Sequence, residues 1–236
     1  MNKTVIITGA SRGIGYELAK RFKKSNYNVV GTYLNSTNNA SKLEKLNIDM
    51  IKADVSKYSE IESVYAYAVN KYKSVDLVIN NAGIALPQKC VLDVTEEEFN
   101  NVLNVNLKGV FNSTKLAIST MLNNAGKIIN VSSIFALNGG SCEAVYSASK
   151  AGVLAFSRAV SEELSSTFVS VCTVILGLID TDMNSHLSNE EKLDFVKSCG
   201  LKTIPKPKTV ANKIFKIASI NGDNGKVYKI SVGKFI

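Results

Sequence analysis

Tyr146 and Lys150 are the two side chains of this sequence best suited to chemistry. They stand four residues apart, and a helix brings positions i and i+4 onto one face. An ammonium group beside a phenol stabilises the phenolate and lowers the pKa of the phenol. We therefore predict that Tyr146 donates a proton near neutral pH, which a free tyrosine does poorly. The same spacing occurs in many helices without chemistry, so the rest of the chain must decide.

A glycine-rich segment, residues 8–15, stands between an apolar run at 3–8 and a helical pattern that begins at Ile14. Its glycines permit a tight turn that lets backbone N–H groups approach a pyrophosphate, and the N-terminus of the following helix favours the negative charge. The spacing is G-x-x-x-G-x-G rather than the commoner G-x-G-x-x-G. The glycines alone leave open a tight turn without a ligand. The residues predicted to bind are Gly9, Ser11, Arg12, Gly13, Ile14 and Gly15.

The choice of dinucleotide depends on the residues that follow this turn. Sites for NAD usually place an acidic residue about 20 positions on, where it binds the ribose 2′-hydroxyl. No Asp or Glu occurs between Glu17 and Glu44, and the second apolar run ends at Tyr33 and Asn35. Arg12 lies inside the glycine segment, where it is placed to meet a 2′-phosphate or, alternatively, only solvent. The pattern favours NADP as the cofactor.

Runs with strand character alternate with helical patterns along the whole chain. The predicted strands are 3–8, 28–33, 48–52, 75–80, 127–131, 168–175 and 226–231. The predicted helices begin at 14, lie around 43–46, and cover 59–71, 95–123, 145–165, 190–199 and 209–218, with capping-box pairs Ser59/Glu62 and Thr95/Glu98. This alternation predicts an α/β protein, a single-domain Rossmann fold over residues 1–236, with a doubly wound seven-stranded parallel sheet and helices on both faces.

Composition excludes several classes of protein. The chain has 236 residues, 45% hydrophobic and 20% charged, which is ordinary for a soluble globular domain. The longest apolar run, 169–179, is too short to span a bilayer, so we expect a cytoplasmic protein without a membrane segment. The net charge of +8 favours anionic ligands such as phosphates, coenzyme A or an acidic carrier protein. The lysines are spread along the chain without a zinc-finger or RNA-binding signature, so we expect no nucleic-acid partner.

The cysteines and the histidine restrict the chemistry further. The cysteines, at positions 90, 142, 172 and 199, show no paired spacing. This argues against a disulfide framework and against a metal site, and predicts free thiols in a reducing compartment. His186 is the single histidine, which excludes any mechanism that needs two.

Several of these motifs occur together in a known order. Residues 8–15 and 80–83, Asn106, Ser133 and the Tyr146/Lys150 pair resemble the short-chain dehydrogenase/reductase family from residue 3 to about 233. Within that family the chain is most similar to β-ketoacyl-(acyl-carrier-protein) reductases and acetoacetyl-CoA reductases, with supporting stretches at 126–133 and 179–183.

The resemblance implies a catalytic tetrad of Asn106, Ser133, Tyr146 and Lys150. It implies that Tyr146 gives its proton to a carbonyl oxygen while a nicotinamide delivers hydride to the carbon. Lys150 lowers the pKa of the tyrosine and binds the ribose hydroxyls, and Asn106 anchors a water that relays protons to Lys150. Ser133 holds the substrate oxygen, so that two donors stabilise the developing alkoxide. Ser132 competes for this role, and the family spacing to the tyrosine favours Ser133.

The resemblance also implies the remaining cofactor contacts. Asn81, Ala82 and Gly83 approach the cofactor with little bulk, Asp54 and Val55 border the adenine, Thr181 binds the nicotinamide amide, and Ile179 packs nearby. Taken singly, Asp54 and Thr181 are equally consistent with helix caps and Asn81 with a turn.

A substrate lid is expected at about residues 181–205. An apolar lining is offered by Met183, Leu187, Phe195 and Leu201, together with Ile84, Leu86, Phe135 and Leu137. The same residues are also consistent with the core of two short helices. An apolar pocket suits an acyl chain, a sterol or a small ketone.

Three departures from the family pattern bear on substrate and assembly. Leu176 precedes Gly177 where the family usually has proline, and Gly233 is followed by Lys234 rather than a second glycine. Residues 122–125 and 165–167 lack the basic side chains that tend to accompany carrier-protein substrates, so charge steering of an acidic carrier would be lost there. The relatives often use the C-terminal end at a tetramer interface, so we expect a homo-oligomer, tetramer or dimer.

The sequence therefore predicts an NADPH-dependent reductase of a 3-oxoacyl thioester, linked to coenzyme A or to an acyl carrier protein as partner. One alternative is the same chemistry on another small ketone, sugar, steroid or modified amino group. Another is a dinucleotide-binding scaffold without catalysis, although a scaffold has no need of Tyr146 and Lys150 together.

Overall fold

The computed structural model describes residues 2–184, 187–198 and 203–231. The strands are β1 (Thr4–Ile7), β2 (Asn28–Tyr33), β3 (Asp49–Lys52), β4 (Leu77–Asn80), β5 (Gly126–Ser133), β6 (Val169–Leu176) and β7 (Val227–Ile230). The α-helices are α1 (Gly13–Lys24), α2 (Thr37–Glu44), α3 (Tyr58–Tyr72), α4 (Glu96–Leu103), α5 (Gly109–Met121), α6 (Phe135–Asn138), α7 (Ala144–Glu163), α8 (Asn189–Ser198) and α9 (Pro207–Ala218). Shorter helical segments are η1 (Val91–Asp93), η2 (Asn104–Lys108) and η3 (Asp182–Asn184).

All seven strands form one parallel sheet in the order β3-β2-β1-β4-β5-β6-β7. The chain winds outward from β1 to β3, then returns to place β4 on the other side of β1. In such sheets, ligands bind beyond the carboxyl ends of the strands at the point where the winding reverses. The predicted seven-stranded Rossmann fold is confirmed.

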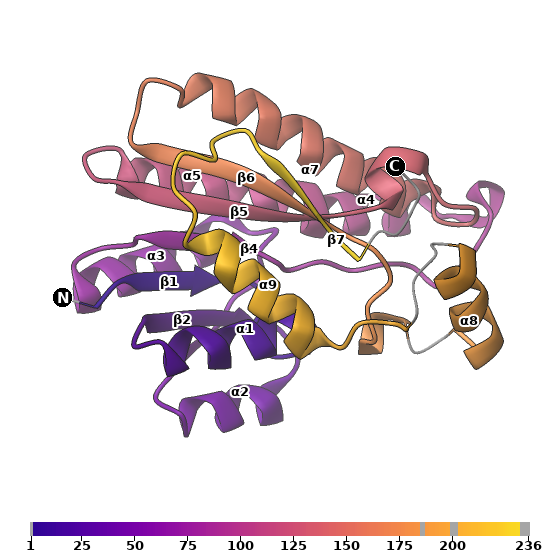
Figure 1. The fold of residues 1–236 in the computed structure, drawn as a ribbon, viewed down its shortest axis with the longest axis horizontal. Coiled ribbons are helices and arrows are strands. Elements are labelled where there is room, and N and C mark those ends of the chain that lie inside the picture. The colour runs from indigo at the N-terminus through magenta and orange to yellow at the C-terminus, as the bar shows by residue number, and fades with distance from the viewer. Residues whose placement is uncertain (1, 185–186, 199–202, 232–236) are drawn as a thin grey trace.

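The two faces of the sheet carry separate hydrophobic clusters. Side chains alternate between the faces of a strand, and Val5 and Ile7 accordingly pack in one cluster with residues of α1, α2 and α9. Ile6 packs in the other cluster, with residues of α3, α5 and α7. Figure 1 shows α1, α2 and α9 grouped together, apart from α5 and α7. The prediction of a doubly wound sheet with helices on both faces is therefore correct.

The long helix predicted at 95–123 is interrupted. Thr95 and Glu98 form the expected capping box at the start of α4. The chain then widens into a π-helical turn, η2, and continues as α5. Such π-turns are rare and frequent at functional sites, and this one contains Asn106, a residue of the predicted tetrad. A π-turn of this length is a local change in a chain that stays helical on both sides, so the sequence pattern did not reveal it.

The second predicted capping box is wrong. Helix α3 begins one residue before Ser59, after Lys57, and its N-terminus has no side-chain cap. The acidic residue in the first turn of α3 is Glu60 rather than Glu62. Its carboxylate accepts a hydrogen bond from the backbone N–H of Asp54 at 2.7 Å. This bond joins α3 to the loop that follows β3.

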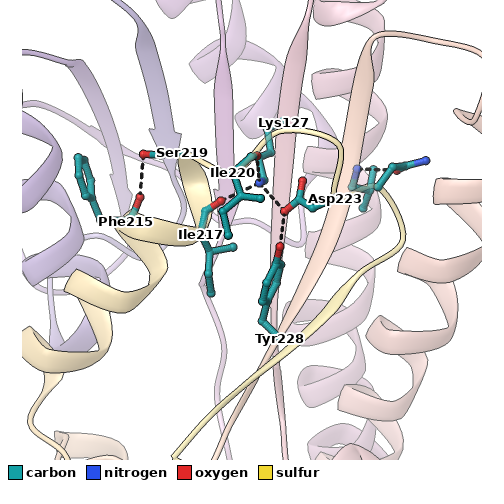
Figure 2. Close-up of polar contacts among 9 residues, drawn as sticks. Lys127, Phe215, Ile217, Ser219, Ile220, Asp223 and Tyr228 are labelled. Atoms are coloured by element: carbon teal, nitrogen blue, oxygen red, sulfur yellow. Dashed lines mark hydrogen bonds and ion pairs between the residues drawn. The ribbon is translucent and has the colours of Figure 1, made fainter.

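A buried ion pair lies at the amino end of the sheet (Figure 2). Lys127 is the second residue of β5, and its Nζ atom is 2.6 Å from Oδ2 of Asp223. The same ammonium donates to the carbonyl oxygens of Ile217 and Ile220, at 2.7 and 2.9 Å, and Tyr228 donates its hydroxyl to Asp223 at 2.9 Å. A cation at a helix C-terminus binds the last carbonyls, so this cluster holds α9 and the loop before β7 against the sheet.

Helix α8 stands beyond the carboxyl end of the sheet, on the side toward which the β1 arrow points in Figure 1. Its Phe195 packs against Ile134 and Phe135 in a small third cluster. Residues 185–186 and 199–202, and with them His186, Cys199 and Leu201, lie outside the described residues. Across the described ranges, every helix is either too short or too polar to cross a membrane.

Candidate active site

A cavity of about 330 Å³ lies at the carboxyl ends of the strands. Its walls come from the loops after β1, β2, β3, β4 and β6 and from the end of β5, so it occupies the position where the winding reverses. Among the residues predicted from the sequence, it is lined by Gly9, Ser11, Arg12, Gly13, Ile14, Asp54, Val55, Asn81, Ala82, Gly83, Ser133, Tyr146, Lys150, Ile179 and Thr181. Gly15 and Asn106 do not line it, and both lie directly behind lining residues.

Gly9 and Gly15 are needed for the close packing of the glycine loop. Gly9 has φ +66°, and a Cβ atom there would lie 2.9 Å from Cα of Ala82. A Cβ atom on Gly15 would collide with the carbonyl oxygen of Gly9. The loop is also tied to β4, because the Asn81 amide donates to the carbonyl oxygens of Thr8 and Gly9, at 3.0 and 3.2 Å. Asn81 thus acts as a turn residue and also borders the cavity.

The N-terminus of α1 is open to an anion. Arg12 is its N-cap residue, no side chain caps the first turn, and that turn carries no acidic residue. Free backbone N–H groups at a helix N-terminus form a site for phosphate. The Arg12 side chain is exposed at the rim of the same cavity. These residues fit the pyrophosphate of a dinucleotide.

Tyr146 and Lys150 project from the first turns of α7 into the cavity, as predicted. The Lys150 Nζ atom lies 5.8 Å from the centre of the Tyr146 ring and donates to the carbonyl oxygen of Val131 at 3.1 Å. Lys150 is 4% exposed, and no carboxylate pairs with it among the described residues. Burial without a counter-charge lowers the pKa of Lys150 to about 8.

Burial dominates the pKa of Tyr146 in the chain itself, and the lowering expected from Lys150 together with the nicotinamide stays a prediction. Burial raises the pKa of Tyr146 to about 12, hydrogen bonding with Ser133 offsets part of that rise, and Glu143 adds to it. The side chain is only half-buried, so water in the cavity limits the penalty. The four-residue spacing predicts that Lys150 lies beside Tyr146, but it does not predict how deeply the two side chains are buried. Here burial has the larger effect on the pKa of Tyr146.

The two candidate serines differ in their partners. Ser132 donates its hydroxyl to the carbonyl oxygen of Lys150 at 2.9 Å, which ties β5 to α7. Ser133 ends β5, and its Oγ atom accepts a 3.3 Å bond from the backbone N–H of Phe135, a bond that does not use its hydroxyl proton. Ser133 is also the serine whose hydroxyl affects the pKa of Tyr146.

Asn106 is fully buried behind the cavity wall. Its amide nitrogen donates to the carbonyl oxygen of Ile84 at 2.9 Å and to Oγ of Ser149 at 3.0 Å, and its Oδ1 atom accepts from the Ile84 N–H at 2.8 Å. One amide hydrogen therefore holds the loop after β4, and the other bonds Ser149 of α7. A Cβ atom on Gly83 would lie 3.3 Å from Oδ1 of Asn106 and 3.4 Å from Nζ of Lys150, so both groups border the same space.

The remaining predicted positions have the following contacts. The Asp54 carboxylate accepts from the N–H and the hydroxyl of Ser56, at 2.9 and 2.7 Å, which shapes the loop beside Val55. Thr181 lies against the glycine loop, since a Cβ atom on Gly13 would be 3.4 Å from its methyl group. Of the apolar residues expected at the lid, the cavity wall includes Met183, Phe195, Ile84 and Phe135, whereas Leu86, Leu137 and Leu187 do not line it.

Sequence reasoning missed Glu143. This residue precedes α7, lines the cavity, and carries a carboxyl group whose pKa is raised by burial. Its position three residues before Tyr146 is the signal that was available, because that spacing shares a helix face. The described residues contain no group of three His, Cys, Asp or Glu side chains placed to hold a metal ion.

Comparison with known proteins assigns the fold and site to a class. A sequence profile described as "short chain dehydrogenase" matches residues 3–192. The chain belongs to the short-chain dehydrogenase family and is an oxidoreductase of that family.

The chain is similar to the 3-oxoacyl-(acyl-carrier-protein) reductase FabG of Staphylococcus epidermidis, with 34% identity over 93% of this chain and 92% of the relative. It is 33% identical to the protein of the same name from Chlamydia trachomatis, over 93% of this chain and 91% of the relative. The crystal structure of 3-ketoacyl-(acyl-carrier-protein) reductase from Brucella melitensis complexed with NADH superimposes with a TM-score of 0.92, 25% identity, and coverage of 99% and 98% of the two chains.

Proposed function

We infer that this protein reduces the ketone of a 3-oxoacyl thioester to the 3-hydroxyacyl form with a reduced nicotinamide dinucleotide. The observation that carries this proposal is the convergence of Ser133, Tyr146 and Lys150 on one cavity beside an uncapped helix N-terminus. The names of the relatives support the substrate class, because both FabG proteins and the Brucella enzyme are reductases of 3-oxoacyl groups on a carrier protein.

In the proposed reaction, Ser133 and Tyr146 donate hydrogen bonds to the carbonyl oxygen of the substrate. When bound, the dinucleotide supplies the hydride that reduces the carbonyl carbon. Tyr146 then transfers its phenolic proton to the oxygen, which two donors have stabilised as it gains charge. Lys150 binds the ribose hydroxyls and holds a proton at Nζ that stabilises the phenolate left behind.

The low pKa of Lys150 gives the reduction a pH dependence. At pH 7 the side chain, with a pKa of about 8, carries its proton. As the pH rises through about 8 the ammonium is lost, so the rate of reduction should fall while oxidation of the alcohol is favoured. A reduction rate that stays level from pH 7 to 9.5 would contradict the role proposed for Lys150.

We propose that Asn106 has a positioning role: it holds the predicted water next to Lys150. Its side chain fixes Ile84, and one acceptor site of Oδ1 remains on the side it shares with Lys150 and Gly83. A water in that space would receive from Lys150 and relay its proton. Gly83→Ala would narrow the space, so it should slow turnover more than it weakens dinucleotide binding.

We propose NADPH as the preferred cofactor. The lining residues at and after the end of β2 are Tyr33, Leu34, Asn35 and Ser36, none of them acidic, and Arg12 lines the same cavity. A 2′-phosphate meets no carboxylate there and gains one cation. The NADH complex of the Brucella relative makes NADH the competing choice. Arg12→Ala should raise KM for NADPH about tenfold and leave KM for NADH within about twofold, since a charged hydrogen bond is worth about 1.5–3 kcal/mol.

We further propose that residues 1–236 are one domain in which about 181–205 act as the substrate lid. Phe195 of α8 supports this, because it packs against Ile134 and Phe135 and also lines the cavity. An acyl chain is the substrate part that such a surface favours.

We propose that the substrate is a thioester carried by coenzyme A or by an acyl carrier protein. We also propose that the protein forms a homo-oligomer and works in the cytoplasm. Phe99 and Phe111 are exposed on α4 and α5, at 42% and 45%, and an apolar helix face of this kind suits contact between copies. Light scattering on the purified protein gives the number of copies directly.

The deciding experiment measures oxidation of NADPH and NADH with acetoacetyl-CoA, with a 3-oxoacyl carrier-protein substrate, and with small ketones. Tyr146→Phe is the control. Turnover of a thioester that the variant loses would support the proposal, and the ratio of the two thioesters would identify the carrier. Turnover of small ketones alone would reject the substrate class, and no turnover with intact dinucleotide binding would reject catalysis.

A further inference from the structure

Two thiols lie side by side on segments that also line the cavity. The Sγ atoms of Cys90 and Cys142 are 3.8 Å apart, although the residues are 52 positions apart in the chain. Both are free thiols, Cys90 exposed and Cys142 half-buried. The spacing in the sequence did not reveal that two of the predicted free thiols meet.

The segments that carry these thiols form two walls of the active site. Cys90 ends the loop after β4, whose Ile84 and Ala85 line the cavity. Cys142 directly precedes Glu143, a lining residue, and stands four residues before Tyr146. One backbone hydrogen bond, from Lys89 N–H to the carbonyl oxygen of Cys142 at 3.4 Å, already joins the segments.

Local contacts hold both cysteines in place. Lys89 forms an ion pair with Glu98 at 2.7 Å, which anchors the residue beside Cys90 to α4. Cys142 has φ +59°, a left-handed conformation that non-glycine residues rarely adopt. Strained backbone that persists beside an active site is a reason to look for a function.

We propose that Cys90 and Cys142 form a reversible disulfide under peroxide, and that this modification closes the two walls toward each other. A disulfide brings the sulfur atoms from 3.8 Å to about 2.05 Å and fixes the two segments to each other covalently. The pair is then a redox-modification site that slows entry of the acyl substrate, while the dinucleotide end of the cavity stays unchanged.

The chemistry balances with hydrogen peroxide as the oxidant. The more exposed thiolate, Cys90, attacks one peroxide oxygen; an S–O bond forms, the O–O bond breaks, and the departing hydroxide takes a proton to become water. The Cys142 thiolate then attacks the sulfenic sulfur, and the S–O oxygen leaves as a second water. Two thiols are oxidised by two electrons and one peroxide is reduced. Hydrogen bonding with Cys142 raises the pKa of Cys90, so the reaction should accelerate as the pH rises.

The test uses the full chain with Cys199→Ser, which leaves Cys90, Cys142 and the buried Cys172. After treatment with one equivalent of peroxide, intact mass and peptide mapping should show the loss of two hydrogens and a peptide pair joined through Cys90 and Cys142. Dithiothreitol should reverse both changes. Cys90→Ser and Cys142→Ser are matched controls that should show no cross-link.

The functional consequence has its own readout. Oxidation should lower kcat/KM for acetoacetyl-CoA by about tenfold, because displacements of about 1 Å near reacting groups cost up to about 100-fold. Dinucleotide affinity should change by less than about twofold. The effect on activity rests on the proposed function, whereas the cross-link does not, so failure of the reductase assay leaves the mass measurement decisive.

Three outcomes would overturn the proposal. They are a disulfide between two copies of the chain, oxidation of one sulfur to sulfinic acid without a cross-link, and a cross-link that leaves kcat/KM unchanged on an active enzyme. If a serine variant fails to fold, peptide mapping of the oxidised parent chain still decides whether the pair joins.

Discussion

Among the residues that the structure describes, two lysines are buried, and they differ in the groups that contact them. Lys127 and Lys150 are 7% and 4% exposed, and they lie at opposite ends of the same sheet. Lys127 contacts a carboxylate at 2.6 Å and two carbonyl oxygens (Figure 2). Lys150 has one carbonyl oxygen, that of Val131, at 3.1 Å.

The difference teaches that partners, rather than burial, decide what a buried lysine does. Removing an ammonium from water is costly unless an opposite charge and hydrogen bonds replace the solvent. Asp223 supplies that charge to Lys127, so its ammonium is used to join α9 to the sheet. Lys150 lacks it, and burial lowers its pKa to about 8, within reach of physiological pH. A proton that is easily lost and regained suits catalysis.

Each lysine is accompanied by a tyrosine. Burial raises the pKa of both Tyr146 and Tyr228 to about 12. Tyr228 donates its hydroxyl to Asp223 at 2.9 Å, whereas the Tyr146 hydroxyl lies in the cavity with Ser133. Matched substitutions at the two sites therefore separate chemistry from stability.

Tyr146→Phe should have the largest effect. It removes the proposed proton donor, and proton transfer together with oxyanion stabilisation is worth about 10³-fold or more in rate. We expect kcat to fall by that factor while the dissociation constant of NADPH and the Tm remain nearly unchanged. Steady-state kinetics, fluorescence titration and thermal melting check the three parts. A variant that retains a tenth of the rate would remove Tyr146 from the mechanism.

Asp223→Asn should come next, with the opposite profile. It leaves a buried ammonium without its carboxylate, which costs about 3–5 kcal/mol. We expect that loss in the free energy of unfolding in urea, with kcat per folded molecule unchanged. The double variant Lys127→Met/Asp223→Leu removes both charges and should lose less than the single variant. If Asp223→Asn were as stable as the parent, the ion pair would not hold α9 in place.

Lys150 should also give the stability a pH dependence. Its pKa is about 8 in the folded protein and about 10.4 when unfolded, so the unfolded chain binds more protons between these values. Stability should therefore rise with pH from about 8 upward, by at most about 3 kcal/mol at 1.36 kcal/mol per pKa unit. The difference in free energy of unfolding between the parent and Lys150→Met, measured from pH 7 to 9.5, isolates this contribution. If the difference in free energy of unfolding between the two proteins did not change with pH, the pKa of Lys150 would not be lowered in the folded protein.

Tyr228→Phe should have the smallest effect. It removes one partly buried hydrogen bond to a carboxylate, which is worth about 1–2 kcal/mol. We expect the free energy of unfolding in urea to fall by that amount. Reductase activity should stay at the level of the parent protein. Loss of activity at this position would break the comparison, because Tyr228 would then affect the site from the far end of the sheet.

The sequence determined the features that are periodic or local. Alternating apolar runs placed the seven strands, and the comparisons and the sheet order confirm the family and the fold. The i and i+4 spacing placed Tyr146 and Lys150 on one helix face, and the glycine segment lies before α1 as predicted. Local spacing is preserved on folding because helices and strands have fixed repeats.

Only the tertiary structure decided which groups meet across the chain and how deeply they are buried. Lys127 meets Asp223 across 96 positions, Cys90 meets Cys142 across 52, and Asn106 meets Ser149 across 43. The π-turn that carries Asn106 and the burial that raises the pKa of Tyr146 were likewise absent from the pattern. Such contacts depend on the paths of loops and on the packing of both faces of the sheet. Burial and partners set a pKa, so the chemistry of a side chain is decided only when the whole fold surrounds it.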